Sequence, residues 1–333
     1  NLVRSGKREK ALKLLLDVPK DGHDEKSLYA LGKIYFLEGD NEQAREYLER
    51  ADTLVENNTR IIEALFEIDN KEGRLDESYQ RIQEAMIVHP NSGPLFYLRG
   101  MVSLLEGEQN LAENDFRQAI YLSPNDMRAY QGLAAILGRS DRRQEVIDTY
   151  ETALRAKPEG AAGIYLMVGT LYEMSGLKMK AIERYGQALA LDPNLAPAQN
   201  NLAYLLADTD GDLDRALELA QAAKAQIPED PSVADTLGWV LYKKGISSAA
   251  ITYLQEAASG LPVGSAALGM VQYHLALAYE LNGDKEQATE VLTEALAAYE
   301  GPKAQALTEG ATIVDPNWVK EAQEALRRIQ ESS

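Results

Sequence analysis

Proline and glycine recur along this chain with one common spacing of 34 or 35 residues. The prolines that keep this spacing are Pro90, Pro124, Pro158, Pro193, Pro228 and Pro262. A second series keeps the same period and consists of Gly39, Gly73, Gly107, Gly176, Gly211 and Gly245, with Asp141 where one glycine is missing. Both residue types interrupt helices, so two series with one period indicate an array of repeated units rather than one large core.

Small residues also recur at fixed places inside the repeated unit. Alanine pairs seven residues apart occur at Ala44 and Ala51, Ala112 and Ala119, Ala181 and Ala188, Ala250 and Ala257, and Ala288 and Ala295. A large residue lies between the members of each pair, at Leu48, Phe116, Tyr185, Leu254 and Leu292. This spacing predicts a helix that packs one face closely on a neighbour. The preceding half of the unit has a small residue of its own, as in Leu31-Gly32 and Leu237-Gly238.

These residues resemble the tetratricopeptide repeat (TPR) family, whose 34-residue helix–turn–helix unit has Leu-Gly, Tyr, Ala, aromatic and Pro positions. The resemblance implies an all-α fold, a right-handed superhelical solenoid. It predicts eight units, at 25–58, 59–92, 93–126, 127–161, 162–195, 196–230, 231–264 and 265–302. Residues 1–24 are expected to be a truncated repeat, and 303–333 a linker and a capping helix. The second unit has Phe66 and Ser78 where small residues are usual, which predicts wider helix spacing there.

Charge and composition narrow the classes of partner. The chain has 34 Lys and Arg against 52 Asp and Glu, a net charge of −18, and such a surface repels nucleic acid and anionic lipid. It has no cysteine, so disulfides and thiolate metal sites are excluded. No apolar run reaches the roughly 20 residues of a membrane helix. Because Asn1 falls partway along an expected repeat, we expect a further N-terminal portion before it.

The resemblance also implies where a partner binds. In TPR proteins, four positions of each first helix face a concave groove, and these positions include Tyr29, Lys33, Tyr97, Met101, Asn200, Tyr204, Trp239, Tyr242 and Tyr273. Tyr204, Trp239, Tyr242 and Tyr273 come from three consecutive units, so this stretch is the predicted peptide-binding site, since Tyr and Trp dominate binding hot spots. The alternative is that Trp239 and Tyr242 pack between helices.

Few features of the sequence indicate another kind of binding site or a catalytic site. Asn200 and Asn201 are followed by Asp235 and Thr236 in the next unit, so the Lys and Asn clamp of chaperone-tail binders is absent, as is a ladder of Asn residues. The segment 208–214 is rich in Asp, but its Gly is misplaced for a calcium loop, and a helix N-cap is the simpler interpretation. No phosphate-binding loop or hydrolase motif occurs, and His89 and His274 lack metal-ligand neighbours. We therefore expect no catalytic residue, cofactor or metal.

The sequence predicts a scaffold that binds a protein or peptide, and self-association stays open. Residues 200–207 and 235–242 resemble bacterial TPR proteins of exopolysaccharide and exosortase systems, which implies a role in the envelope and favours the periplasm over the cytoplasm. A general cytoplasmic adaptor is a second interpretation. A third is a docking or regulatory region of a larger enzyme whose catalytic domain lies before Asn1.

Overall fold

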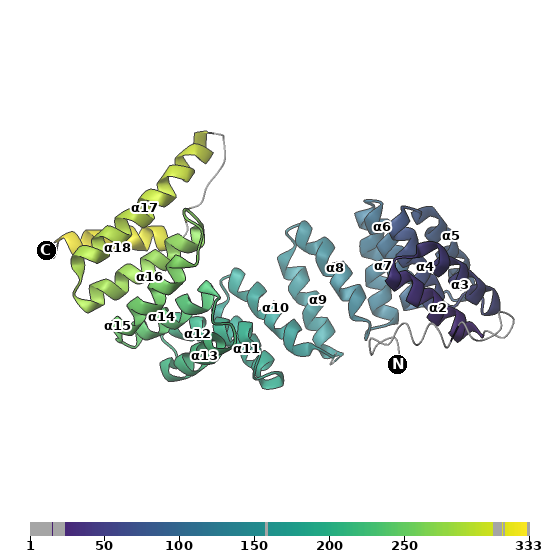
Figure 1. Cartoon of the computed structure of the whole chain (residues 1–333), viewed down its shortest axis with the longest axis horizontal. Coiled ribbons are helices and arrows are strands. Elements are labelled where there is room, and N and C mark those ends of the chain that lie inside the picture. Colours follow the sequence, from purple (N-terminus) through teal and green to yellow (C-terminus); the bar gives the residue numbers. More distant parts are fainter. Residues whose placement is uncertain (1–14, 16–23, 157–158, 309–314, 316, 332–333) are drawn as a thin grey trace. The chain divides into compact units, whose positions relative to one another are not determined.

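The computed structural model describes residues 15, 24–156, 159–308, 315 and 317–331, and every regular element in these ranges is an α-helix (Figure 1). The chain divides into two compact units, Asn1–Pro158 and Glu159–Ser333, which are described separately below. Unit 1 contains α2 (Glu25–Glu38), α3 (Asn41–Leu54), α4 (Thr59–Glu72), α5 (Leu75–Val88), α6 (Gly93–Leu105), α7 (Gln109–Leu122), α8 (Met127–Arg139) and α9 (Arg143–Arg155). Unit 2 contains α10 (Ala161–Met174), α11 (Lys178–Leu191), α12 (Ala196–Asp208), α13 (Leu213–Gln226), α14 (Pro231–Lys243), α15 (Ser247–Ser259), α16 (Ala266–Asn282), α17 (Lys285–Thr308) and α18 (Asn317–Glu331).

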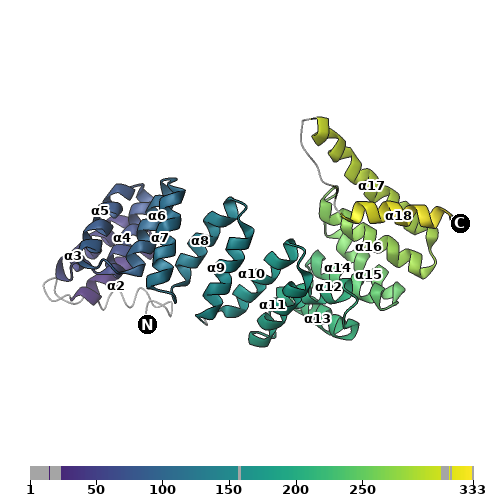
Figure 2. The ribbon, with the colours of Figure 1, turned by 180° about the vertical axis from the view of Figure 1, so that it is seen from behind.

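The helices pair into hairpins, in which α2 to α16 with even numbers are the first helices and α3 to α17 with odd numbers the second helices (Figures 1 and 2). The recurring Gly ends many of the first helices. Gly39 adopts a left-handed backbone with φ 87°, and its N–H bonds back to carbonyl oxygens of the last turn of α2. Asp141 takes the same role with φ 54°, a conformation that Asp tolerates better than most residues. The all-α helix–turn–helix solenoid fold is therefore confirmed within each unit.

Close contact between paired helices depends on glycines in the first helices. In unit 1, Phe116 of α7 is fully buried, and a Cβ atom added at Gly100 or Gly132 would lie 2.9 or 2.7 Å from its ring. In unit 2, a Cβ at Gly169 would lie 2.5 Å from the ring of Tyr185. Such distances are below normal van der Waals contact, so any larger residue would push the helices apart.

In the second hairpin, α4 and α5, the unusual residue Ser78 forms a hydrogen bond with a buried carboxylate. Ser78 is 1% exposed and donates a 2.6 Å hydrogen bond to the carboxylate of Asp69, which is fully buried. Arg81 donates to the same carboxylate at 3.0 Å, and Arg45 of α3 pairs with it as well. A buried carboxylate needs such partners because desolvation penalises the charged form. The hydroxyl of Ser78 thus supplies a hydrogen bond that Ala could not.

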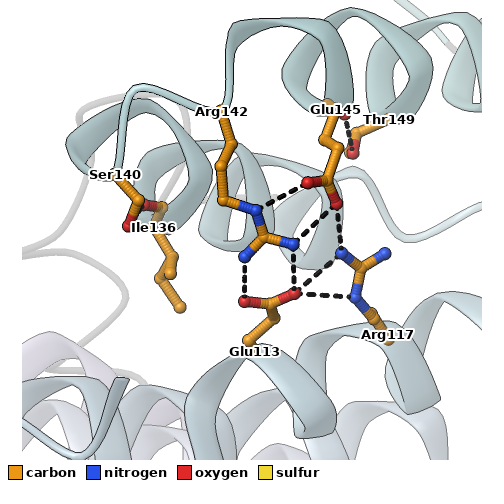
Figure 3. Close-up of polar contacts among 7 residues, drawn as sticks. All are labelled: Glu113, Arg117, Ile136, Ser140, Arg142, Glu145 and Thr149. Carbon is orange, nitrogen blue, oxygen red and sulfur yellow. Dashed lines mark hydrogen bonds and ion pairs between the residues drawn. The ribbon is translucent and has the colours of Figure 1, made fainter. Parts of the chain in front are cut away.

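Ion pairs also link second helices of unit 1. Figure 3 shows Glu113 and Arg117 of α7 facing Arg142, which precedes α9, and Glu145 of α9. Arg142 contacts Glu113 at 2.7 Å and Glu145 at 2.6 Å, while Arg117 contacts the same two carboxylates at 2.7 and 3.1 Å. Each guanidinium therefore bridges both carboxylates, and the four side chains join α7 to the start of α9.

The end of unit 2 differs from the expected boundaries. Helix α17 does not stop at residue 302 but continues through Gly301 and Pro302 to Thr308. Helix α18 begins at Asn317, as the Asp-Pro-Asn sequence indicates, and contacts α16 and α17 (Figures 1 and 2). Its buried Trp318 fills the space above Gly269, where an added Cβ would lie 2.5 Å from the ring. Apart from Leu15 and Asp24, the truncated repeat expected at 1–24 lies outside the described residues.

Candidate functional site

Three first helices of unit 2 form the frame of the candidate site. Helix α14 lies between α12 and α16 and contacts both. Each start is set by local sequence: α12 and α14 have Pro in the first turn, where no N–H partner is needed. The Asp230 carboxylate accepts a 2.8 Å bond from the N–H of Ser232, and the Ser265 hydroxyl accepts one from Leu268. These starts set which side chains of the three helices meet.

The aromatic cluster consists of Tyr204, Trp239, Tyr242, Tyr273 and His274. His274 lies at its centre, only 2% exposed, with its ring stacked on Trp239 at a centroid distance of 4.2 Å. Tyr204 and Tyr273 approach His274 at 6.4 and 5.9 Å with tilted rings, and Tyr242 stacks on Trp239 at 5.1 Å. The structure therefore brings the four aromatic residues expected from the sequence into one continuous cluster.

The members of the cluster differ in exposure. Trp239 is 8% exposed, so it forms the floor of the cluster, whereas Tyr204, Tyr242 and Tyr273 are half-buried and form its surface. The packing role that the sequence left open for Trp239 and Tyr242 is therefore visible, most completely for Trp239. Its indole N–H is buried without a hydrogen-bond acceptor among the described residues. An unsatisfied buried donor costs about 1–3 kcal/mol.

An acidic side chain fixes the central histidine. Asp235 of α14 lies 2.9 Å from Nδ1 of His274, and the side chain of Asp235 is 14% exposed. The contact joins two neighbouring first helices and sets the orientation of the imidazole. The rings of Tyr204, Trp239 and Tyr273 all pack against this imidazole. No role for His274 was predicted from the sequence, because its contact with Asp235 spans 39 residues and no local motif indicates it.

The negative charges of four carboxylates, each on a different helix, act on the hydroxyl of Tyr204. Burial raises the pKa of the Tyr204 hydroxyl above its usual 10, and the negative charges of Asp208, Asp235, Glu173 and Glu321 raise the pKa further. For Tyr273, burial is again the main cause of a raised pKa, followed by the charge of Glu321. Both tyrosines therefore stay protonated across the neutral range and keep hydroxyl donors on this surface.

A buried tyrosine holds one of these carboxylates in place. Tyr185 of α11 is fully buried, and its hydroxyl donates a 2.6 Å bond to Glu173 of α10. The same hydroxyl accepts a 3.3 Å bond from the side-chain amide of Asn201 on α12. Its neighbour Asn200, an expected site residue, donates to Asn201 at 3.3 Å and keeps its own buried side-chain oxygen without a partner in the described part of the chain. This network links Glu173 of α10 through Tyr185 to Asn201 of α12.

Helix α18 contributes to the same surface. Arg328 forms a 2.6 Å ion pair with Glu280 of α16, and its charge also acts on the hydroxyl groups of Tyr242 and Tyr273. Glu321, about two helical turns earlier, is exposed beside Tyr273. Helix α18 contacts α16 and α17 in the way that a first helix contacts the preceding hairpin. It therefore adds one helix to the row of first helices of unit 2, which are α10, α12, α14 and α16. We call the surface of this row the first-helix face of unit 2.

The expected site residues of unit 1 belong to helices α2 and α6. Tyr29 and Lys33 lie on α2, where Lys33 pairs with Glu67 of α4 at 2.6 Å. Tyr97 and Met101 lie on α6 and pack partly buried against the core, and the guanidinium of Arg128 lies 4.7 Å from the ring of Tyr97. Lys33 therefore already has an acidic partner on a neighbouring first helix. No aromatic cluster like that of unit 2 occurs among the described residues of unit 1.

The acidic turn after α12 is explained by lysines and a cap. Asp208 pairs with Lys178 at 2.5 Å and Asp210 with Lys243 at 2.6 Å, while Asp214 pairs with Lys244. Asp212 accepts a 2.9 Å bond from the N–H of Arg215 and caps α13. In the part of the chain that the structure describes, no group of three acidic or His side chains could hold a metal ion, and no helix is long and apolar enough to cross a membrane.

Comparisons with known proteins agree with the repeat. Family models described as tetratricopeptide repeat match residues 25–58 and 93–126, 166–231, and 270–301. Among curated proteins, the human protein O-mannosyl-transferase TMTC1 is 26% identical over 175 residues, which are 52% of this chain and 20% of that protein. TPR repeat-containing protein PA4667 of Pseudomonas aeruginosa is 28% identical over 193 residues, 58% of this chain and 27% of that protein. The chain thus spans about a fifth to a quarter of these relatives.

A solved structure supports the fold. The crystal structure of the APC/C hetero-tetramer Cut9-Hcn1 matches with a TM-score of 0.50 and 16% identity over 97% of this chain and 59% of that chain. At this identity the match shows the solenoid fold and nothing about the partner.

Proposed function

Because the chain carries tetratricopeptide repeats, we propose that it is a protein-interaction scaffold whose binding surface includes the first-helix face of unit 2. The observation that carries this proposal is the aromatic cluster, in which Tyr204, Tyr242 and Tyr273 stay half-buried around the buried Trp239. Rigid aromatic side chains give large contact area at low entropic cost, and stacked repeats present such residues on one extended surface. The bound partner is a peptide or a helix of another protein.

The test compares the proteins captured by a double variant of the cluster with those captured by a single control variant. We expect Tyr204→Ala with Tyr273→Ala to lose a defined set of proteins from a lysate of the source organism, measured by quantitative mass spectrometry. Truncating a hot-spot residue costs about 2 kcal/mol or more, so the loss should be at least about 30-fold. Trp239 is left intact because it is part of the core.

The matched control is Tyr253→Ala, since Tyr253 is half-buried on the second helix α15 and lies outside the cluster. It should leave the captured set unchanged. Equal capture by the Tyr204 and Tyr273 variant, with unchanged circular dichroism and tryptophan fluorescence, would contradict this surface as the binding site.

The cellular setting is a further part of the proposal. A bacterial envelope role in exopolysaccharide or exosortase systems is supported by the resemblance of residues 200–207 and 235–242 to TPR proteins of those systems. A signal peptide or lipobox in the coding sequence upstream of Asn1 would favour it. An upstream Met with further repeats would favour a cytoplasmic adaptor instead.

A second candidate is the docking or regulatory region of a larger enzyme. The similarity to part of the O-mannosyl-transferase TMTC1 favours it, because in that protein a repeat region belongs to a chain named as a transferase. A catalytic motif in the same upstream coding sequence would support this candidate, and the first-helix face would then hold the enzyme's substrate or a regulator.

A further inference from the structure

The first-helix face of unit 2 has more acidic groups than the cations around it neutralise. Asp208 pairs with Lys178, and Asp235 lies 2.9 Å from the imidazole of His274, with no ion pair to a Lys or Arg within the residues that the structure describes. Glu173 receives the hydroxyl of Tyr185, which is neutral, and Glu321 is exposed beside Tyr273. Within the described residues, no ion pair joins Glu173 or Glu321 to a Lys or Arg.

Two cations beside this surface already have acidic partners. Lys243 lies 5.6 Å from the ring of Trp239 and pairs with Asp210 at 2.6 Å. Arg328 pairs with Glu280 at 2.6 Å. Neither Lys243 nor Arg328 is therefore available to neutralise Glu173 or Glu321. A partner that contacts these carboxylates gains most if it carries positive charge itself.

The tyrosines of the cluster offer ring faces that suit a cation. Elsewhere this chain places Lys or Arg over aromatic rings, as Arg128 does over Tyr97 and Lys71 over Phe36. No such contact is found at Tyr204, Tyr242 or Tyr273 in the described ranges. A ring face flanked by carboxylates attracts an ammonium or guanidinium group twice, through the ring quadrupole and through the charges.

Trp239 gives the cluster a rigid base. It is 92% buried and stacks on both Tyr242 and His274. Its indole N–H is itself buried, so a bound segment meets the half-buried tyrosines rather than this donor. Rigid aromatic side chains suit a peptide, and the carboxylates indicate its charge.

We propose that the first-helix face of unit 2 binds a basic segment of a partner protein, with a Lys or Arg side chain against Tyr204 among the carboxylates of Glu173, Asp208, Asp235 and Glu321. This inference rests on the proposed function and specifies the partner's chemistry. The net charge of −18 assists by attracting such a segment over longer distances, which raises the association rate more than the specificity.

The experiment uses three fluorescently labelled peptides of one length that share their apolar residues and differ only in carrying Arg, Gln or Glu at the same positions. Binding to the full chain is measured by fluorescence anisotropy at low and physiological ionic strength. We expect the Arg peptide to bind at least about tenfold more tightly than the Gln peptide, and the Glu peptide to bind most weakly.

Paired variants separate a site from general attraction. Glu173→Gln with Glu321→Gln should weaken the Arg peptide about tenfold and leave the Gln peptide nearly unchanged. Glu286→Gln with Glu290→Gln removes the same charge from exposed positions of the second helix α17, and should change binding of the Arg peptide less than about twofold. Circular dichroism and tryptophan fluorescence check that both variants fold.

Three results would overturn the inference. Equal weakening by the two variants would mean that a basic peptide is attracted by the acidic chain as a whole. Failure of the Arg peptide to bind would exclude a basic segment. Equal binding of the Arg and Gln peptides, lost in Tyr204→Ala, would reject the preference for a basic segment while the proposed binding face remained in place.

Discussion

A glycine in the first helix decides how closely two helices pack in several of the hairpins. At Gly238 of α14, an added Cβ would lie 2.6 Å from Cγ of Leu254 and 3.3 Å from the carbonyl oxygen of Ala250. Leu254 is fully buried, so its side chain cannot move aside without displacing other core residues. The recurring pairing of a small residue with Leu or an aromatic residue was therefore enough to predict this contact from sequence.

We expect Gly238→Ala to destabilise unit 2 by about 1–3 kcal/mol, because overpacking a close helix contact forces a backbone or side-chain shift. Urea unfolding followed by tryptophan fluorescence measures the effect. Gly186→Ala in α11 is the matched control, since nothing lies within 4 Å of its added Cβ. It should be neutral or stabilise the helix by up to about 1 kcal/mol. Equal losses in the two variants would show that helix spacing at Gly238 does not limit stability.

The contacts that shape the candidate site were less accessible to sequence reasoning. The period shows which positions lie on the same face of each first helix, and on this basis the sequence grouped Tyr204, Trp239, Tyr242 and Tyr273, whose rings form one cluster in the structure. It does not show how deeply a side chain sinks between neighbouring helices, so the burial of Trp239 was left open. The partnership of His274 with Asp235 depends on the offset between α14 and α16, which no local motif encodes.

The ends of helices were predicted most closely in units that have another repeat before and after them. Each second helix from α5 to α15 lies between a recurring Gly or Asp and a recurring Pro, and these residues are visible in the sequence. At the chain's end no further repeat follows, and α17 continues to Thr308 instead of ending near 302. The amphipathic pattern of α18 predicted a cap, and the structure adds that α18 also carries Glu321 and Arg328 into the first-helix face.

Contacts between second helices yield a pH-dependent contribution to stability. Hydrogen bonds from Arg142, and to a lesser degree from Arg117, hold the pKa of Glu113 below its usual 4.5 (Figure 3). A carboxylate whose pKa is lower in the folded than in the unfolded state stabilises the fold above the unfolded pKa. That contribution disappears as pH falls through the lower, folded value.

We therefore expect Glu113→Gln to lower the free energy of unfolding at pH 7 by about 1 kcal/mol at most, since the ion pairs are partly exposed. The difference from the wild type should shrink as pH falls below about 4.5. Urea unfolding followed by circular dichroism across this range measures it. Glu106→Gln serves as control, because Glu106 is exposed and forms no ion pair in the described part of the chain. A difference that stays constant with pH would rule out the ion pairs as its source.

At the scale of the whole molecule, stability should be local. In stacked repeats each hairpin contacts only its neighbours, so a mutation affects the unit that contains it more than the other. The chain divides into two compact units, and both of its tryptophans, Trp239 and Trp318, belong to unit 2. Tryptophan fluorescence therefore reports on unit 2, while circular dichroism reports on the helices of both units.

This placement of tryptophans makes the independence of the units measurable. Leu65 is fully buried in the core of unit 1, and Leu65→Ala should cost about 2–5 kcal/mol by leaving a cavity. With a urea m-value of about 2 kcal/mol/M, part of the circular dichroism transition should move by about 1 M or more to lower urea. The fluorescence midpoint should not move. Leu254→Ala, the matched change in unit 2, should shift the fluorescence midpoint instead. If Leu65→Ala lowered both midpoints equally, the two units would unfold as one cooperative body, and binding at the first-helix face would then depend on the stability of the whole chain.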